Sequence, residues 1–229
     1  MRLAKPASRR LKFWRERPIA LLSGLTAHER KPCPLTLSKW TTRSRRSRLK
    51  TFFRGLLAMP HFLFAGVYTL AFFVVYVIAW LALMFTGSWP AGLYQFASGY
   101  LRYSARLAAY LNFGVDQYPP FSGAVDDSYP VRVEIAPALA RYSRVKVFFR
   151  GIYAILAMLI RYALGIVLAV VAFLSWFAIV FTGRQPASLQ NALNFALSYT
   201  VRADALIFLI TETYPPLGDG EVASPQPAV

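Results

Sequence analysis

The sequence predicts an all-α membrane protein with four transmembrane helices, arranged as two tandem helical hairpins that each follow a short cytoplasmic β-strand. Three observations lead to this fold class. The chain contains two long runs without charge, it repeats itself over most of its length, and glycine and proline stand at matching positions where helices would end.

Two stretches of 20 or more residues, 62–85 and 162–181, contain no Asp, Glu, Lys, Arg or His. About 20 apolar residues are enough to cross a hydrocarbon core of about 30 Å. The chain has 229 residues, of which 56% are hydrophobic, and a soluble domain of this size has no core that would bury two such helices on all sides. We therefore expect both stretches to lie in a membrane.

The repeat appears when the chain is shifted by 96 residues, because residues 34–121 then align without a gap and share 28 identities in 88 positions. Phe52-Phe53-Arg54-Gly55 aligns with Phe148-Phe149-Arg150-Gly151, and Tyr118-Pro119-Pro120 aligns with Tyr214-Pro215-Pro216. Ordered matches of Arg, Trp, Gly and Pro are not produced by biased composition. The predicted organisation is a basic tail (1–32), a first unit (33–122), a second unit (129–218) and a disordered tail (219–229).

Each unit has glycine and proline where the helices of a helical hairpin would begin and end. The first helix would begin near Phe52 or Phe148 and end at Thr86-Gly87 or Thr182-Gly183, because Gly commonly terminates helices and Pro suits the start of the next one. The second helix would cover about 92–115 and 188–211, ending before Tyr-Pro-Pro. Alternating apolar and polar residues near Pro130–Glu134, and less regularly near Pro34–Ser38, predict a short strand before each hairpin.

The charge predicts orientation. Residues 1–54 contain 16 of the 26 Lys and Arg and only two acids, so their net charge is +14. Under the positive-inside rule this places the N-terminal tail, the linker and the C-terminus in the cytoplasm, with the two units as parallel copies. The second helix of each unit carries charge, Arg102 and Arg106 in one and Arg202 and Asp204 in the other, so an alternative is that it lies in the interface.

Arginine and tryptophan supply the candidate site residues. Arginines near the cytoplasmic end would bind anions or lipid headgroups, or anchor the helices by snorkelling; these are Arg102, Arg106, Arg202, Arg54 and Arg150. Trp80, Trp89 and Trp176 would form an interfacial aromatic belt. The sequence contains one Cys and two separated His, and it lacks the common hydrolase, metalloprotease and phosphate-loop motifs, so no catalytic residue, metal or cofactor is predicted.

The motifs themselves resemble those of a known family. The segment that begins Tyr129-Pro-Val-Arg-Val-Glu, the Phe-Phe-Arg sequence, the long apolar helix ending Trp-x-x-x-x-Phe-Thr-Gly, and Asp116-Gln-Tyr-Pro-Pro-Phe together are similar to the bacterial membrane family named domain of unknown function 4389, in two copies. The second copy departs at Arg184-Gln185 and at Glu212. The resemblance implies a bacterial inner-membrane protein and no particular activity.

The predicted function is a non-enzymatic membrane component, an accessory or scaffold subunit of a bacterial inner-membrane complex. Its basic cytoplasmic face would bind anionic lipid or a protein partner, and self-association or other membrane subunits are expected. The alternative is a small oligomeric transporter or channel, although the polar residues in the spans are few. A third interpretation, a nucleic-acid tether through residues 1–50, is the one that the membrane spans favour least.

Overall fold

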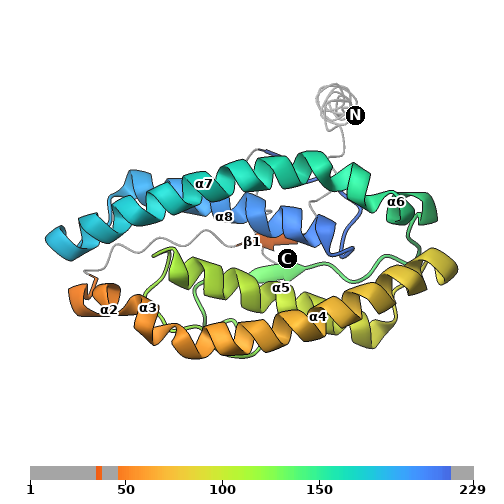
Figure 1. Cartoon of the computed structure of the whole chain (residues 1–229), viewed down its shortest axis with the longest axis horizontal. Helices are drawn as coiled ribbons and strands as arrows, with labels where there is room; N and C mark the ends of the chain where they lie inside the picture. The colour runs from red at the N-terminus through yellow and green to blue at the C-terminus, as the bar shows by residue number, and fades with distance from the viewer. Residues whose placement is uncertain (1–34, 38–45, 218–229) are drawn as a thin grey trace, which may run out of the picture. The chain divides into compact units, whose positions relative to one another are not determined.

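The computed structural model describes residues 35–37 and 46–217, which form two helical units of the same plan and one pair of short strands (Figure 1). The predicted tails 1–32 and 219–229 lie outside the described residues. Along the chain the elements are β1 (Leu35–Leu37), α2 (Arg48–Phe52), α3 (Arg54–Leu57), α4 (Met59–Thr86), α5 (Ala91–Leu111), β2 (Val133–Ile135), α6 (Arg144–Phe148), α7 (Arg150–Thr182) and α8 (Ala187–Ile207).

The helix ends follow the repeated residues closely. Ser47 and Ser143 cap α2 and α6, each accepting a bond from the backbone N–H three residues later. The long helices α4 and α7 both end at a glycine in the left-handed region, with φ of 74° at Gly87 and 71° at Gly183. That conformation favours a residue without a Cβ, and the predicted Thr-Gly helix ends are confirmed.

Among the described residues, α4 and α7 are the helices that are long and apolar enough to cross a membrane. Few of their side chains are buried inside the protein. The other long helices, α5 and α8, do not meet the same criterion, so two of the four predicted spans have this support. A helix of 28 to 33 residues is about 42–50 Å long at 1.5 Å per residue, which exceeds a hydrocarbon core of about 30 Å.

The two units run in opposite directions, which corrects the prediction of parallel copies. The N–H of Tyr142, just before α6, donates to the carbonyl of Gly87 at the end of α4 (2.7 Å), and the N–H of Arg46, just before α2, donates to Gly183 at the end of α7 (3.0 Å). Each unit therefore starts where the long helix of the other unit ends, and α4 and α7 are antiparallel (Figure 1). The linker from α5 to α6 returns along the length of the helices.

The two bonds are equivalent under the 96-residue shift, and so is the strand pairing. β1 and β2 are antiparallel, with Leu37 opposite Val133. These two residues occupy the same position in their units, so a pseudo-two-fold axis passes between them. By symmetry, the paired strands lie midway along the long helices.

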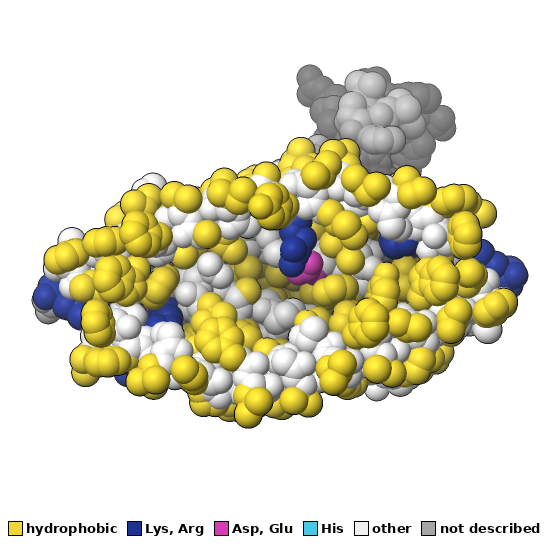
Figure 2. Space-filling model, viewed as in Figure 1, with side chains coloured by type: hydrophobic (Ala, Val, Ile, Leu, Met, Phe, Trp, Pro, Cys, Tyr) yellow, Lys and Arg dark blue, Asp and Glu magenta, His cyan; other side chains and the backbone are white. Residues whose placement is uncertain are grey.

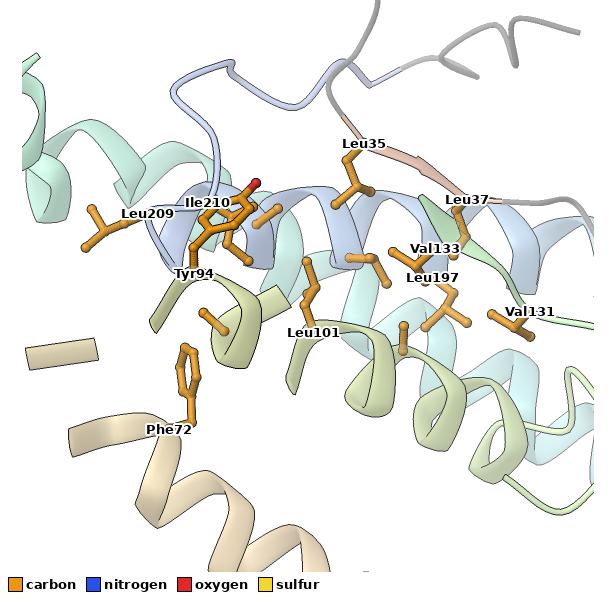
Figure 3. Close-up of a cluster of buried hydrophobic side chains, with 14 of the residues drawn as sticks. Leu35, Leu37, Phe72, Tyr94, Leu101, Val131, Val133, Leu197, Leu209 and Ile210 are labelled. Atoms are coloured by element: carbon orange, nitrogen blue, oxygen red, sulfur yellow. The ribbon is translucent and has the colours of Figure 1, made fainter. Parts of the chain in front are cut away.

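The core surrounds this axis (Figure 3). Leu35, Leu37 and Val133 of the strands pack with Leu101 of α5 and Leu197 of α8, and all five are buried. Leu101 and Leu197 are again equivalent residues. The core is therefore shared by both units, and neither unit encloses it alone.

Candidate functional site

A cluster of two arginines and one acid joins the units near the start of α2. The Arg54 guanidinium donates to the carboxylate of Asp116 (2.6 Å) and to the carbonyl of Tyr110 (2.6 Å). Arg46 donates to the carbonyl of Gly114 (3.0 Å) and, across the unit boundary, to Oε1 of Gln190 in α8 (3.1 Å). Both arginine side chains are buried, whereas the side chain of Asp116 is one-third exposed.

Burial lowers the pKa of both guanidinium groups below the usual value for arginine, and the charge of Asp116 opposes this shift. The guanidinium of Arg54 also lies 4.7 Å from the ring centroids of Tyr110 and Phe113. Rings and carbonyls therefore replace water around a charge that would otherwise be expensive to bury. The arrangement holds the helix starts together and leaves little of Arg54 exposed to a headgroup.

The second unit has the same residue types in a different arrangement. Arg150 is 3% exposed, and none of its three side-chain nitrogens has a hydrogen-bond partner among the described residues. Glu212, which corresponds to Asp116, accepts instead from the N–H of Ser143 (2.6 Å) and lies 3.8 Å from Lys146. Both units therefore have an arginine and an acid at these equivalent positions, but the two residues pair with each other only in the first unit, among the described residues.

The remaining predicted arginines point into the protein. Nη1 of Arg106 lies 3.4 Å from the carbonyl of Ser122, and its guanidinium stands over the ring of Tyr129. Arg202 donates to the backbone and hydroxyl oxygens of Ser198, and half-buried Arg102 donates to the carbonyl of Val133. Arg106 and Arg202 thus have different contacts, and their role in binding a headgroup stays a prediction.

The three tryptophans predicted to be interfacial make contacts between the units. Nε1 of buried Trp89 donates to the carbonyl of Leu209 (2.9 Å), and Nε1 of Trp80 donates to Val147 (3.3 Å). Trp176, equivalent to Trp80, lies beside Phe52 of the first unit, with ring centroids 6.3 Å apart. Trp80 and Trp176 are each half-buried, so a place in an aromatic belt remains compatible with these contacts.

An ion pair that was not among the predicted site residues joins α7 to α8 in the second unit. Nε of Arg161 donates to Oδ1 of Asp204 in α8 at 2.6 Å. The side chain of Arg161 is 44% exposed and that of Asp204 is 13% exposed. Arg161 makes this one hydrogen bond within the described part of the chain, so both terminal nitrogens of the guanidinium remain available.

The pair lies in an open groove of about 630 Å³, whose lining residues are Ile155, Met158, Leu159, Arg161, Tyr162, Asp204, Ile207 and Phe208. Figure 2 shows a largely apolar face that is hollowed near its centre, where basic and acidic side chains lie side by side. The groove borders the first unit, because Phe208 packs against Phe72, with ring centroids 4.6 Å apart. Apart from the ion pair and Tyr162, its lining is aliphatic or aromatic.

The repeat alignment contained a signal for this site. The positions equivalent to Arg161 and Asp204 are Ala65 and Ala108, so both charges are absent from the first unit together. When two complementary charges occur together in one copy and are both absent from the other, we expect the two residues to be in contact. The two residues are 43 positions apart and on different helices, so an analysis of the faces of single helices could not predict that they are in contact.

A comparison with protein families identifies the repeated unit. The model of a family described as domain of unknown function (DUF4389) matches residues 48–123 and 144–217. No curated protein and no solved structure matches the chain significantly. Because the two matches together cover more than half of the sequence, in the two copies that the repeat predicts, the chain belongs to the family of domain of unknown function 4389.

Proposed function

We propose that this protein is a non-enzymatic membrane component, an accessory or scaffold subunit at the cytoplasmic face of a bacterial inner membrane. One observation carries the proposal. The helices α4 and α7 expose apolar side chains along their length, and exposed basic side chains gather at both of their ends. The basic residues are Arg48, Lys50 and Arg184 at one end, and Arg141, Arg144 and Lys146 at the other.

The position of the charges favours helices that lie along the membrane over helices that cross it. Arg132 and Glu134 are exposed and flank Val133 on the pseudo-two-fold axis, midway along the long helices. Were the helices to cross, both charges would lie near the bilayer centre, at about 2.5–3.5 kcal/mol each for Arg and for acids on insertion scales. The non-helical linker would have to cross as well.

Lying in the interface avoids these problems. With the pseudo-two-fold axis along the membrane normal, α4 and α7 both enter the acyl region, and both basic ends meet headgroups of the same leaflet. All the basic clusters and both termini then face the cytoplasm, in agreement with the positive-inside rule. Each basic residue near an anionic leaflet contributes about 1 kcal/mol of attraction.

Single cysteines test this arrangement in a Cys33→Ser background. Ser88→Cys and Arg184→Cys place a thiol at either end of the helices, and Ser128→Cys places one in the linker. We expect an impermeant maleimide to label all three in inside-out vesicles and none in intact spheroplasts. Labelling of Ser88→Cys and Ser128→Cys from opposite sides would support the four-span arrangement and contradict the interfacial one.

The scaffold role has a separate test. The full chain, purified in mild detergent, is expected to retain a partner subunit or anionic lipid. Charge reversal of one basic end, Arg141→Glu with Arg144→Glu, should release what is bound, while Leu70→Ala on the exposed apolar face serves as a control. A chain that purifies alone, without partner or anionic lipid, would argue against the proposal.

A further inference from the structure

The groove around Arg161 and Asp204 is the feature that the proposed function does not explain. An ion pair whose arginine is 44% exposed on an apolar face is unfavourable in contact with acyl chains, because both charges lose water and have only each other in exchange. The first unit has alanine at both places and keeps the same helices. The helices of the first unit therefore form without such a pair.

We propose that this groove binds one phospholipid whose headgroup carries both a phosphate and a primary ammonium, the chemistry of phosphatidylethanolamine. This inference rests on the proposed membrane location. The two free terminal nitrogens of Arg161 suit a phosphate, for which a planar guanidinium is a bidentate donor. Oδ2 of Asp204, which has no hydrogen bond among the described residues, would accept from the ammonium.

Charge selects the headgroup. Arg161 and Asp204 together are neutral, so a purely anionic headgroup would be attracted by one and repelled by the other at similar distances. A zwitterion satisfies both. A choline headgroup is also zwitterionic, but its quaternary ammonium has no N–H to donate to the carboxylate, so the groove should prefer ethanolamine over choline.

The walls of the groove suit the rest of the lipid. An apolar lining lies beside the ion pair. It consists of Ile155, Met158 and Leu159 of α7, Ile207 at the end of α8, and Phe208 directly after it. One acyl chain can lie along this lining while the headgroup meets the ion pair. Seated at the boundary with the first unit, the lipid would contact both units through Phe208 and its neighbour Phe72.

The test measures which lipid the full chain retains. The protein is purified from nanodiscs that contain equal amounts of phosphatidylethanolamine, phosphatidylglycerol and phosphatidylcholine with identical acyl chains, and the bound lipid is identified by native mass spectrometry. We expect phosphatidylethanolamine to dominate. Asp204→Asn should reduce its retention about tenfold, the loss expected for one hydrogen bond to a charged group, and Arg161→Ala, which removes a bidentate contact, should reduce it at least as much. Arg132→Ala, which changes an exposed arginine beside β2 that lies outside the groove and outside both basic ends, is the matched control.

A double variant keeps the test independent of folding. Arg161→Ala with Asp204→Ala reproduces the alanine pair of the first unit, so it is expected to fold and to lose the preference among lipids. Equal retention of phosphatidylethanolamine by the double variant, or a preference of the unaltered chain for phosphatidylglycerol, would overturn the proposal. If the unaltered chain does not partition into membranes at all, the proposed function fails instead. Fractionation of the cells that express the protein detects that outcome.

Discussion

The first unit joins its buried arginine to an acid and one backbone carbonyl, whereas in the second unit the equivalent arginine has no hydrogen bond among the described residues and a separate ion pair lies at the groove. Arg54 and Asp116 represent the first arrangement, and Arg161 and Asp204 the second. Residues that match between the copies, such as Gly87 and Gly183, belong to the fold. Charges that occur in one copy alone mark where the copies have taken different roles.

The strongest test of this comparison separates the units. If the chain is divided between Asp126 and Asp127, each fragment loses the contacts that α2 makes with α7 and α6 makes with α4. We expect either fragment alone to be degraded or aggregated, and co-expression to restore a complex that an affinity tag on one fragment recovers. A fragment 127–229 that purifies as a folded monomer would show that the shared core is dispensable.

A smaller effect is expected when the equivalent arginines are truncated. Arg54→Ala removes the ion pair with Asp116 and the hydrogen bond to the carbonyl of Tyr110, so the free energy of unfolding should fall by about 3 kcal/mol. Arg150→Ala removes a buried charge that makes no hydrogen bond in the described residues, and the loss should be no more than about 1 kcal/mol. Denaturant unfolding in detergent micelles compares the two, and equal losses would contradict the difference between the units.

The smallest predicted effect concerns Tyr142, the counterpart of Arg46. Its hydroxyl donates to the carbonyl of Ile210 (3.0 Å), and burial raises its pKa from 10.0 to about 12. The folded state therefore holds this proton more tightly than the unfolded state, so stability from Tyr142 is complete below about pH 10 and is lost as the pH rises towards 12.

The variant Tyr142→Phe should lower the free energy of unfolding at neutral pH by about 1–2 kcal/mol, because it loses the bond to Ile210 and the bond that the hydroxyl accepts from the N–H of Leu139 (3.3 Å). It should also weaken the decline in stability between pH 10 and 12. Unfolding curves at several alkaline pH values measure this, with exposed Tyr162→Phe as the control. An alkaline decline unchanged from that of the unaltered chain would show that Tyr142 does not titrate in this way.

The sequence predicted the elements well because their signals are local. The left-handed glycines end the long helices at the predicted residues, and a short strand does precede each hairpin. The repeat could not predict that each unit starts beside the end of the other unit's long helix. Tyr142 aligns with Arg46 whether each residue contacts its own unit or the other one. The pairing of Arg161 with Asp204 depends on how α7 and α8 pack, which helical periodicity within one segment does not describe.

The direct pairing of Leu37 with Val133 has a consequence for how the two copies can differ. Pairing of a residue with its own equivalent is what the two-fold axis of a symmetric homodimer produces, so the geometry of this chain is also open to two separate copies of one unit. In a single chain that carries both units, the two copies need not be identical. A mutation in one half is then not imposed on the other, and a charged pair stands on one side of the axis while alanines occupy the equivalent places across it.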